Sequence, residues 1–417
     1  MTALFDQDDQ PEILVHIGPH KTGTTGLQQA ALRAKAALRS HGRIYLHDEG
    51  REQLNTSVVE FIRLSGERMV SDGKGSLAST QLLRILAQAP RGKIIISSEH
   101  FCRLHESQVI MLRDALQKTP HGRSIKILVT LRPLVKIIPG QWQQFVRSRP
   151  MPPLEEWVRL VLDDNPSESH GRGFRQRHAH DQLVERWAHI FGKERITVIV
   201  ADDDRPEHLY RSFEEVIGVP SGTLTMRRIA NQSLTFEESE VVRAAHDAMQ
   251  RAGMFGSQAA EDRSRAELSS EEVRHLEETA RIGWPYERIA KDLTIDRSFR
   301  EGKRLELKGS VLLEIAKWSR EIVEGIRRLH VHVLGDLELL APSPTAADLE
   351  APRTGQVLVT PRLAGALVVS ALHAVGVGVQ DVEPRVLRKA PTSALIRQLA
   401  KRALPRWIRI RIAGRLR

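Results

Sequence analysis

The sequence predicts an α/β protein: a three-layer parallel sheet that contains a strand–phosphate loop–helix unit, followed by a mostly helical C-terminal part. Short apolar, β-branched runs alternate with segments of helical periodicity along the first 230 residues. A stretch rich in Gly, Lys and Thr stands between the first apolar run and the first helical segment. Strands that are apolar along their whole length are typical of parallel sheets covered by helices on both faces.

The first unit begins with the apolar run Ile13–Ile17, which we expect to be a buried strand. Helical periodicity starts at Leu27, and Gly42 is a suitable stop. Between them lies GPHKTGTT, Gly18–Thr25, whose last two threonines can cap the helix. A helix N-terminus that follows a glycine turn presents free N–H groups and a positive dipole end, so the stretch predicts an anion site with Lys21 as its cation. The alternative is an ordinary strand-to-helix turn with a solvated lysine.

Apolar runs and helical segments continue after this unit. We expect further strands at Ile94–Ile96, Ile125–Leu131 and Ile196–Val200, and helices at Gln108–Leu116 and His180–Phe191. Ligands of parallel sheets gather beyond the carboxyl ends of the strands. The residues that directly follow the strands are therefore the site candidates: Gly18–Thr25, Ser97–His100 and Arg132.

The composition is that of a chain with a folded core. Of its 417 residues, 41% are hydrophobic and 27% are charged, which is ordinary for a globular protein. The single cysteine excludes an internal disulfide framework and a cysteine-based zinc cluster, and is typical of a reducing compartment. The acidic N-terminus has no apolar core, so we expect no signal peptide and a cytoplasmic protein.

The net charge of +10 is concentrated at one end of the chain. Residues 384–417 contain 11 Lys and Arg and no acid, so the other 383 residues have a net charge of −1. A nucleic-acid-binding surface would spread basic residues over a folded face, so we expect no nucleic-acid partner.

The chain is expected to divide into four parts: an α/β core that contains the anion site (1–230), a mainly helical extension (231–340), a linker with an apolar helix (341–383) and a basic amphipathic tail (384–417). The apolar run Leu363–Val379 is short for a membrane span and is expected to be a packed helix. In the tail, basic residues flank the apolar face of Ser393–Leu404, so residues 393–417 are expected to bind an anionic membrane surface. A disordered or docked basic tail is the alternative.

The order Lys21-Thr22-Gly23-Thr24-Thr25 after a strand resembles the sulfotransferases. The phosphate loop of NTPases needs its lysine after the second glycine, and here the lysine precedes Gly23. The resemblance covers about residues 12–245 and implies that the core binds a nucleotide. It implies that 3′-phosphoadenosine 5′-phosphosulfate (PAPS) is the sulfuryl donor, that this loop holds its 5′-phosphosulfate, and that no metal is needed.

The resemblance also implies the other site residues. Arg132 matches the arginine that holds the 3′-phosphate in the family, while the serine expected eight positions later is Gly140, with its backbone N–H or Ser148 as substitutes. Glu99 matches the base of carbohydrate sulfotransferases, with a helix N-terminal acid as the alternative reading. Small-molecule sulfotransferases use a histidine, but the side chain of His100 should point away from that of Glu99 if the backbone is extended.

A later segment, Arg172–Asp203, looks like a further conserved segment of the family, with Phe174 in place of a tyrosine. Its arginines are expected to reach the nucleotide or an anionic acceptor, or to form a solvated loop: Arg172, Arg175 and Arg177. Its histidines lack the acid–histidine pattern of zinc enzymes, so no metal site is expected: His178, His180 and His189.

The resemblance implies a sulfotransferase that moves a sulfuryl group from PAPS to a hydroxyl of a carbohydrate or glycolipid. Lys21 is expected to stabilise the leaving group with help from Thr22, Thr24 and Thr25, and Glu99 is expected to accept the proton. The expected location is the cytoplasm, with peripheral binding at the inner face of the membrane. One alternative is a binding protein impaired by Gly140, and another is a nucleotide-dependent phosphotransferase of the same fold.

Overall fold

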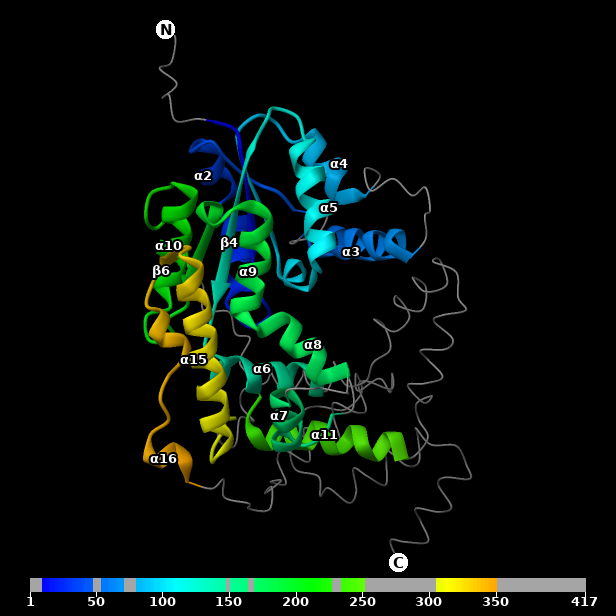
Figure 1. Ribbon diagram of the computed structural model, residues 1–417, viewed down its shortest axis with the longest axis vertical. Helices are drawn as coiled ribbons and strands as arrows, with labels where there is room; N and C mark the ends of the chain where they lie inside the picture. Colours follow the sequence, from blue (N-terminus) through cyan, green and yellow to red (C-terminus); the bar gives the residue numbers. More distant parts are fainter. Residues whose placement is uncertain are drawn as a thin grey trace, which may run out of the picture. The chain divides into compact units, whose positions relative to one another are not determined.

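The computed structural model describes seven ranges of the chain: 10–47, 54–70, 80–147, 151–163, 169–226, 234–251 and 305–350 (Figure 1). The expected apolar helix at Leu363–Val379 and the amphipathic tail from Ser393 lie outside the described residues, as does Ser148. The chain forms two compact units, of which the first comprises 1–138, 158–229 and 307–351 and the second comprises 139–157, 230–306 and 352–417.

The first unit is built on a six-stranded sheet in which every strand pair is parallel. Its order is β2-β3-β1-β4-β5-β6. The strands are β1 (Glu12–Ile17), β2 (Arg43–Tyr45), β3 (Lys93–Ser98), β4 (Ser124–Leu131), β5 (Ile196–Val200) and β6 (His332–Leu334). The four strands expected from the sequence are confirmed as β1, β3, β4 and β5, and with them the parallel α/β fold.

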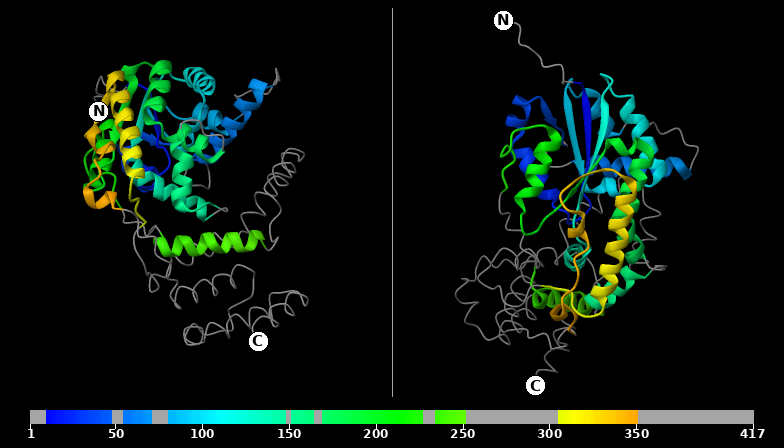
Figure 2. Two further views of the ribbon diagram at one scale, coloured as in Figure 1. Left: turned by 60° about the horizontal axis from the view of Figure 1, so that its bottom comes forward. Right: turned by 60° about the vertical axis from the view of Figure 1, so that its left-hand side comes forward.

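Helices cover both faces of the sheet (Figure 2). One face packs against α1 (Thr24–Arg33), α2 (Lys35–Ser40) and α10 (Glu207–Ile217) through Leu27, Leu38 and Phe213. On the other face lie α5 (Glu106–Gln117) and α9 (His180–Phe191), with α3 (Asn55–Val70) and α4 (Gln81–Gln88) beside α5. The three-layer arrangement expected from the continuous apolar strands is therefore confirmed.

The strand order places a topological switch point between β1 and β4. The chain leaves β1 toward β2 on one side of the sheet, and it leaves β4 toward β5 on the other side. The crevice at the carboxyl ends of two such strands is the usual ligand site of an open α/β sheet. The loop after β1 and the residues after β4 flank this crevice.

The C-terminal end of the described chain returns to the sheet. Helix α15 (Val311–Leu329) packs against α9, and β6 pairs with β5 with Val333 opposite Val198. Helix α15 buries its apolar stripe in the first unit. The expected boundaries at residues 230 and 340 stay predictions. The expected linker after residue 340 contains a short helix, α16 (Ala346–Leu349), with a capping box between Thr345 and Asp348.

The second unit is described around helix α11 (Phe236–Arg251) and the residues that follow Ile138. The Gln143 amide donates to the carbonyl of Leu234 (2.6 Å) and to Ser239 Oγ (3.2 Å), both at the start of α11. Trp142 Nε1 donates to the carbonyl of Pro152 (3.0 Å). Among the described residues, no helix is both long and apolar enough to cross a bilayer.

Candidate functional site

The loop between β1 and α1 has a backbone that its glycines make possible. A Cβ at Gly18 would lie 1.8 Å from Thr24 Oγ1, so only glycine allows the start of α1 to approach so closely. Gly23 has φ 93°, and a Cβ there would lie 2.6 Å from Leu209 Cδ2. Lys21 also has a positive φ of 70°, which is uncommon outside glycine and concentrates at functional positions.

Helix α1 begins at Thr24 and its N-cap is Gly23, whose backbone is left-handed. No side chain caps this terminus, so the expected capping by Thr24 or Thr25 is wrong. The reason is that the Thr24 hydroxyl turns inward and lies 3.3 Å from Thr22 Oγ1. The first N–H groups of an α-helix have no acceptor within the helix, so this uncapped end presents donors to an anion.

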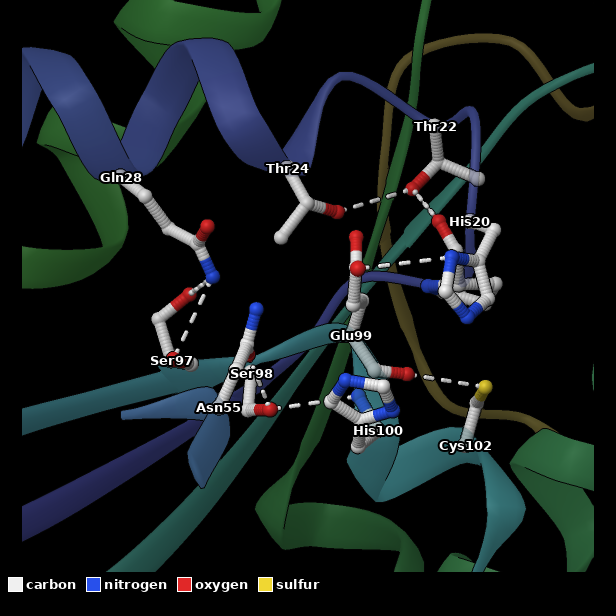
Figure 3. Close-up of polar contacts among 11 residues, drawn as sticks. His20, Thr22, Thr24, Gln28, Asn55, Ser97, Ser98, Glu99, His100 and Cys102 are labelled. Atoms are coloured by element: carbon white, nitrogen blue, oxygen red, sulfur yellow. Dashed lines mark hydrogen bonds and ion pairs between the residues drawn. The ribbon is translucent and has the colours of Figure 1, made fainter. Parts of the chain in front are cut away.

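A buried series of hydrogen bonds lies beneath the loop and joins α1 to three strands. Figure 3 shows its first contact, between Gln28 and Ser97. Gln28 Nε2 donates to Ser97 Oγ (3.1 Å), which lies 2.8 Å from His16 Nδ1. His16 Nε2 lies 3.3 Å from Thr130 Oγ1, which in turn lies 3.1 Å from Thr22 Oγ1. All five side chains are buried. The sequence contained no signal for this network, because its members come from three stretches that lie far apart in the sequence: 16–28, β3 and β4.

One arrangement of the protons gives every hydrogen bond of this network a donor and an acceptor. The hydroxyl of Thr22 donates to the carbonyl of Pro19 (2.8 Å), so its oxygen accepts from Thr130. Thr130 Oγ1 then accepts from His16 Nε2–H, which leaves Nδ1 to accept from Ser97. The hydroxyl proton of Thr22 is therefore used inside the loop, and the role expected for Thr22 at the donor stays a prediction. Burial lowers the pKa of His16 to about 3, which keeps this ring neutral.

Glu99 lies at the same sheet edge, directly after β3 (Figure 3). The backbone there turns into a 3₁₀-helix (Glu99–Arg103) that Ser98 Oγ caps by accepting from the N–H of His100. The backbone is therefore not extended at Glu99 and His100, so the condition under which the His100 side chain was expected to point away from Glu99 is not met. As a result the ring of His100 lies near that of His20, with their centroids 5.8 Å apart.

His20 is the site residue that the sequence reasoning missed. Its Nδ1 lies 3.5 Å from Glu99 Oε1, and the two side chains are 15% and 22% exposed. The sequence did place His20 beside Lys21, in the loop that follows β1. Because β1 pairs with β3, this loop lies next to Glu99, which follows β3. Loop and base candidate thus form one cluster.

The electrostatics of this cluster favour an ionisable carboxylate beside neutral histidines. Burial raises the pKa of Glu99, and the positive charge of Lys21 partly offsets that shift. Burial, with smaller contributions from Arg177, His100, Lys21 and Arg103, lowers the pKa of His20 to about 3. Burial and the nearby arginines likewise lower the pKa of His100 to about 4. A raised carboxyl pKa is what a general base working near neutral pH needs.

Arg132 follows β4 at the switch point, as the sequence predicts, but its guanidinium is already engaged. Its Nε and Nη2 donate to the two oxygens of Asp203 (2.8 and 2.7 Å). Its Nη1 donates to the carbonyl of Lys21 (3.2 Å), so the arginine is attached to the loop itself. The structure thus brings Lys21, Glu99 and Arg132 to one edge, while their roles stay predictions.

The remaining expected residues have different places. Gly140 lies within helix α6 (Leu134–Val146), in the part that belongs to the second unit, and its role stays a prediction. Arg175 donates to the carbonyls of Val161 and Leu162 and lies over the ring of Trp318, so its role is structural. Arg172 has no described side chain, and Arg177 has a pKa lowered by burial.

The three histidines of the segment Arg172–Asp203 differ in burial. His178 and His180 are buried, with ring centroids 5.9 Å apart, whereas His189 is exposed and lies 3.9 Å from Glu106. Within the seven described ranges no three metal-ligating side chains come together.

These buried histidines predict how stability depends on pH. Burial lowers the pKa values of His16 and His20 to about 3 and of His180 to about 4 from the usual 6.5. Below pH 6.5 the unfolded state therefore binds more protons, and each such histidine removes about 1.4 kcal/mol of unfolding free energy per pH unit. Glu99, whose raised pKa acts in the opposite sense, offsets only one of them.

We therefore expect the free energy of unfolding, measured by urea titration, to fall steeply between pH 6.5 and pH 5 and to vary little just above this range. The substitution His16→Gln should make the slope shallower, and His189→Gln, which changes an exposed side chain, is the matched control. A flat profile down to pH 5 would contradict the burial of neutral histidines.

No family model matches the sequence, and no curated protein matches it. Among solved structures, the chain is similar to a sulfotransferase from Alicyclobacillus acidocaldarius, with 16% sequence identity and a TM-score of 0.36. The match covers 60% of this chain and 98% of that chain.

Proposed function

We propose that this protein is a sulfotransferase that moves a sulfuryl group from PAPS to a hydroxyl of a carbohydrate or glycolipid. The proposal rests on the loop that contains Lys21, which lies at the switch point, depends on its glycines and leads into a helix without a side-chain cap. Glu99 lies close enough for the charge of Lys21 to act on it, and the pKa of Glu99 is raised. An anion grip and a base at one edge are the two parts that group transfer to a hydroxyl requires.

The loop fits a phosphosulfate because it supplies donors and a cation without a competing carboxylate from its own residues, 18–25. The donor supplies a sulfur that is already bonded to a good leaving group, its 5′-phosphate. Lys21 stabilises the negative charge that grows on the bridging oxygen as the sulfur–oxygen bond breaks. The N–H groups of Thr24 and Thr25 at the helix start hold the 5′-phosphate.

Glu99 is the base of the proposed reaction. The acceptor hydroxyl oxygen forms the new bond to sulfur, its proton passes to Glu99, and the bisphosphate leaves with the electrons of the broken bond. Because His20 is neutral, it can donate from Nδ1 to one oxygen of Glu99 and leave the other oxygen for the acceptor. This pairing fixes the carboxylate without cancelling its charge.

The experiment that tests the proposal follows labelled sulfate from PAPS into an extract of lipids and sugars. Transfer into a hydroxyl-bearing product supports the proposal and identifies the acceptor. Binding of adenosine 3′,5′-bisphosphate without any transfer would indicate instead the impaired binding protein. Stabilisation by ATP only in the presence of magnesium would indicate a phosphotransferase.

The basic tail, residues 393–417, is proposed to hold the active site near lipid-linked acceptors at an anionic membrane surface. Full-length protein should sediment with vesicles that contain anionic lipid, and a chain that ends at Pro384 should sediment much less. The attraction should weaken with added salt, because it is electrostatic. Equal sedimentation of the two proteins, or none for the full chain at low salt, would remove this part of the proposal.

A further inference from the structure

A carboxylate lies beside the arginine that would meet a second phosphate of the nucleotide. Arg132 directly follows β4, and Asp203 lies three residues after the end of the neighbouring strand β5. The segments that follow these two strands are hydrogen-bonded to each other, since the N–H of Ala201 donates to the carbonyl of Leu131 (2.8 Å). Both side chains are therefore held at the carboxyl edge of the sheet.

The contact between them is bidentate. Nε and Nη2 of Arg132 donate to separate oxygens of Asp203 at 2.8 and 2.7 Å, and the side chains are 27% and 32% exposed. Nη1 donates to the carbonyl of Lys21. All three nitrogens of the guanidinium therefore already donate, and the planar fork that would suit a phosphate faces a carboxylate instead.

The turn after β5 fixes Asp203 in this place. The carboxylate of Asp202 accepts from the backbone N–H groups of Asp204 (2.9 Å) and Arg205 (3.3 Å) and from Arg205 Nε (2.8 Å). Asp202 thus shapes the turn, whereas Asp203 pairs with Arg132. Asp204 is exposed and carries the same charge one residue further on.

The charge of Asp203 would act mainly on the phosphate that Arg132 meets, because Asp203 pairs with that arginine. The 5′-phosphate belongs to the loop, whose cation is Lys21. A 3′-phosphate at Arg132 would lie next to a carboxylate and would meet an arginine whose charge is already neutralised. The serine expected as the second ligand of that phosphate is Gly140 in this chain, so no hydroxyl at that position can compensate.

We propose that Asp203 is a specificity-determining residue that weakens recognition of the donor's 3′-phosphate by holding Arg132 in an ion pair. The inference rests on the proposed function, since it concerns the nucleotide of the same site. Under it the chain recognises its donor mainly through the 5′-phosphosulfate, and it distinguishes poorly between nucleotides with and without a 3′-phosphate.

The test compares the Kd values of adenosine 3′,5′-bisphosphate and adenosine 5′-monophosphate by titration calorimetry. Wild-type protein should bind the two nucleotides with Kd values within about tenfold of each other. Asp203→Asn, which keeps the shape of the side chain and one acceptor oxygen, should tighten bisphosphate binding about tenfold and leave the monophosphate unchanged. Asp204→Asn removes the same charge without touching Arg132 and should behave as wild type.

A second variant shows whether the tighter bisphosphate binding of Asp203→Asn depends on Arg132. Adding Arg132→Ala to Asp203→Asn should remove the new preference for the bisphosphate. The inference is overturned if Asp203→Asn weakens bisphosphate binding, which would make the pair a positioning contact, or if it leaves the ratio of the two Kd values as in wild type. If wild-type protein binds neither nucleotide, the proposed function itself fails.

Discussion

Replacing Lys21 by alanine is expected to abolish the rise in Tm that adenosine 3′,5′-bisphosphate produces in the wild-type protein. The lysine is the cation of the loop, and removing a charge-assisted contact to phosphate costs about 1.5–3 kcal/mol, or a 10- to 100-fold loss of affinity. Alanine, like lysine, has a Cβ, so a φ of 70° at position 21 is about as unfavourable for either residue. The loop itself should therefore persist in the variant. Thermal melts with and without ligand measure the effect.

The matched control for this experiment is Lys118→Ala. Lys118 is exposed and follows α5, at the opposite edge of the sheet from the loop. Its variant should keep the full ligand-induced shift. An equal shift in Lys21→Ala and wild type would show that the nucleotide binds elsewhere.

Replacing Glu99 by glutamine should lower sulfuryl transfer by about 10²- to 10⁴-fold, the usual contribution of a general base. Bisphosphate binding should remain, because glutamine keeps the shape of the side chain and the loop is unchanged. Labelled transfer at saturating donor and the Kd of the bisphosphate separate these two effects.

The wild-type rate should also fall on the acid side as Glu99 takes up a proton. Because burial raises the pKa of Glu99, this fall should begin at a higher pH than for an exposed glutamate. Glu106→Gln, an exposed change at the start of α5, serves as the control. If Glu99→Gln retained wild-type transfer, another group would be the base.

The long strands and the loop were predictable from the sequence because local patterns encode them. The strands β1, β3, β4 and β5 are continuous apolar runs, and the loop has its glycines at positions where no other residue fits. By contrast, β2 and β6 have three residues each, too few for any periodicity, and they form only because a neighbouring strand is there to pair with them.

The chemistry of the site was predictable only in part, because several of its contacts join segments far apart in the sequence. Arg132 and Asp203 lie 71 positions apart, and no local pattern reveals that the arginine is paired. The network from Gln28 through His16 to Thr22 likewise depends on the order of the strands. His20 was overlooked because its partner Glu99 belongs to another strand end.

The central claim is that the loop of Lys21 is a site for an adenosine nucleotide that carries phosphosulfate. The most direct measurement is the calorimetric titration of wild-type protein with adenosine 3′,5′-bisphosphate, with and without magnesium. We expect one bound nucleotide per chain and the same affinity in both conditions. No binding at all, or binding that appears only when magnesium is added, would contradict the claim.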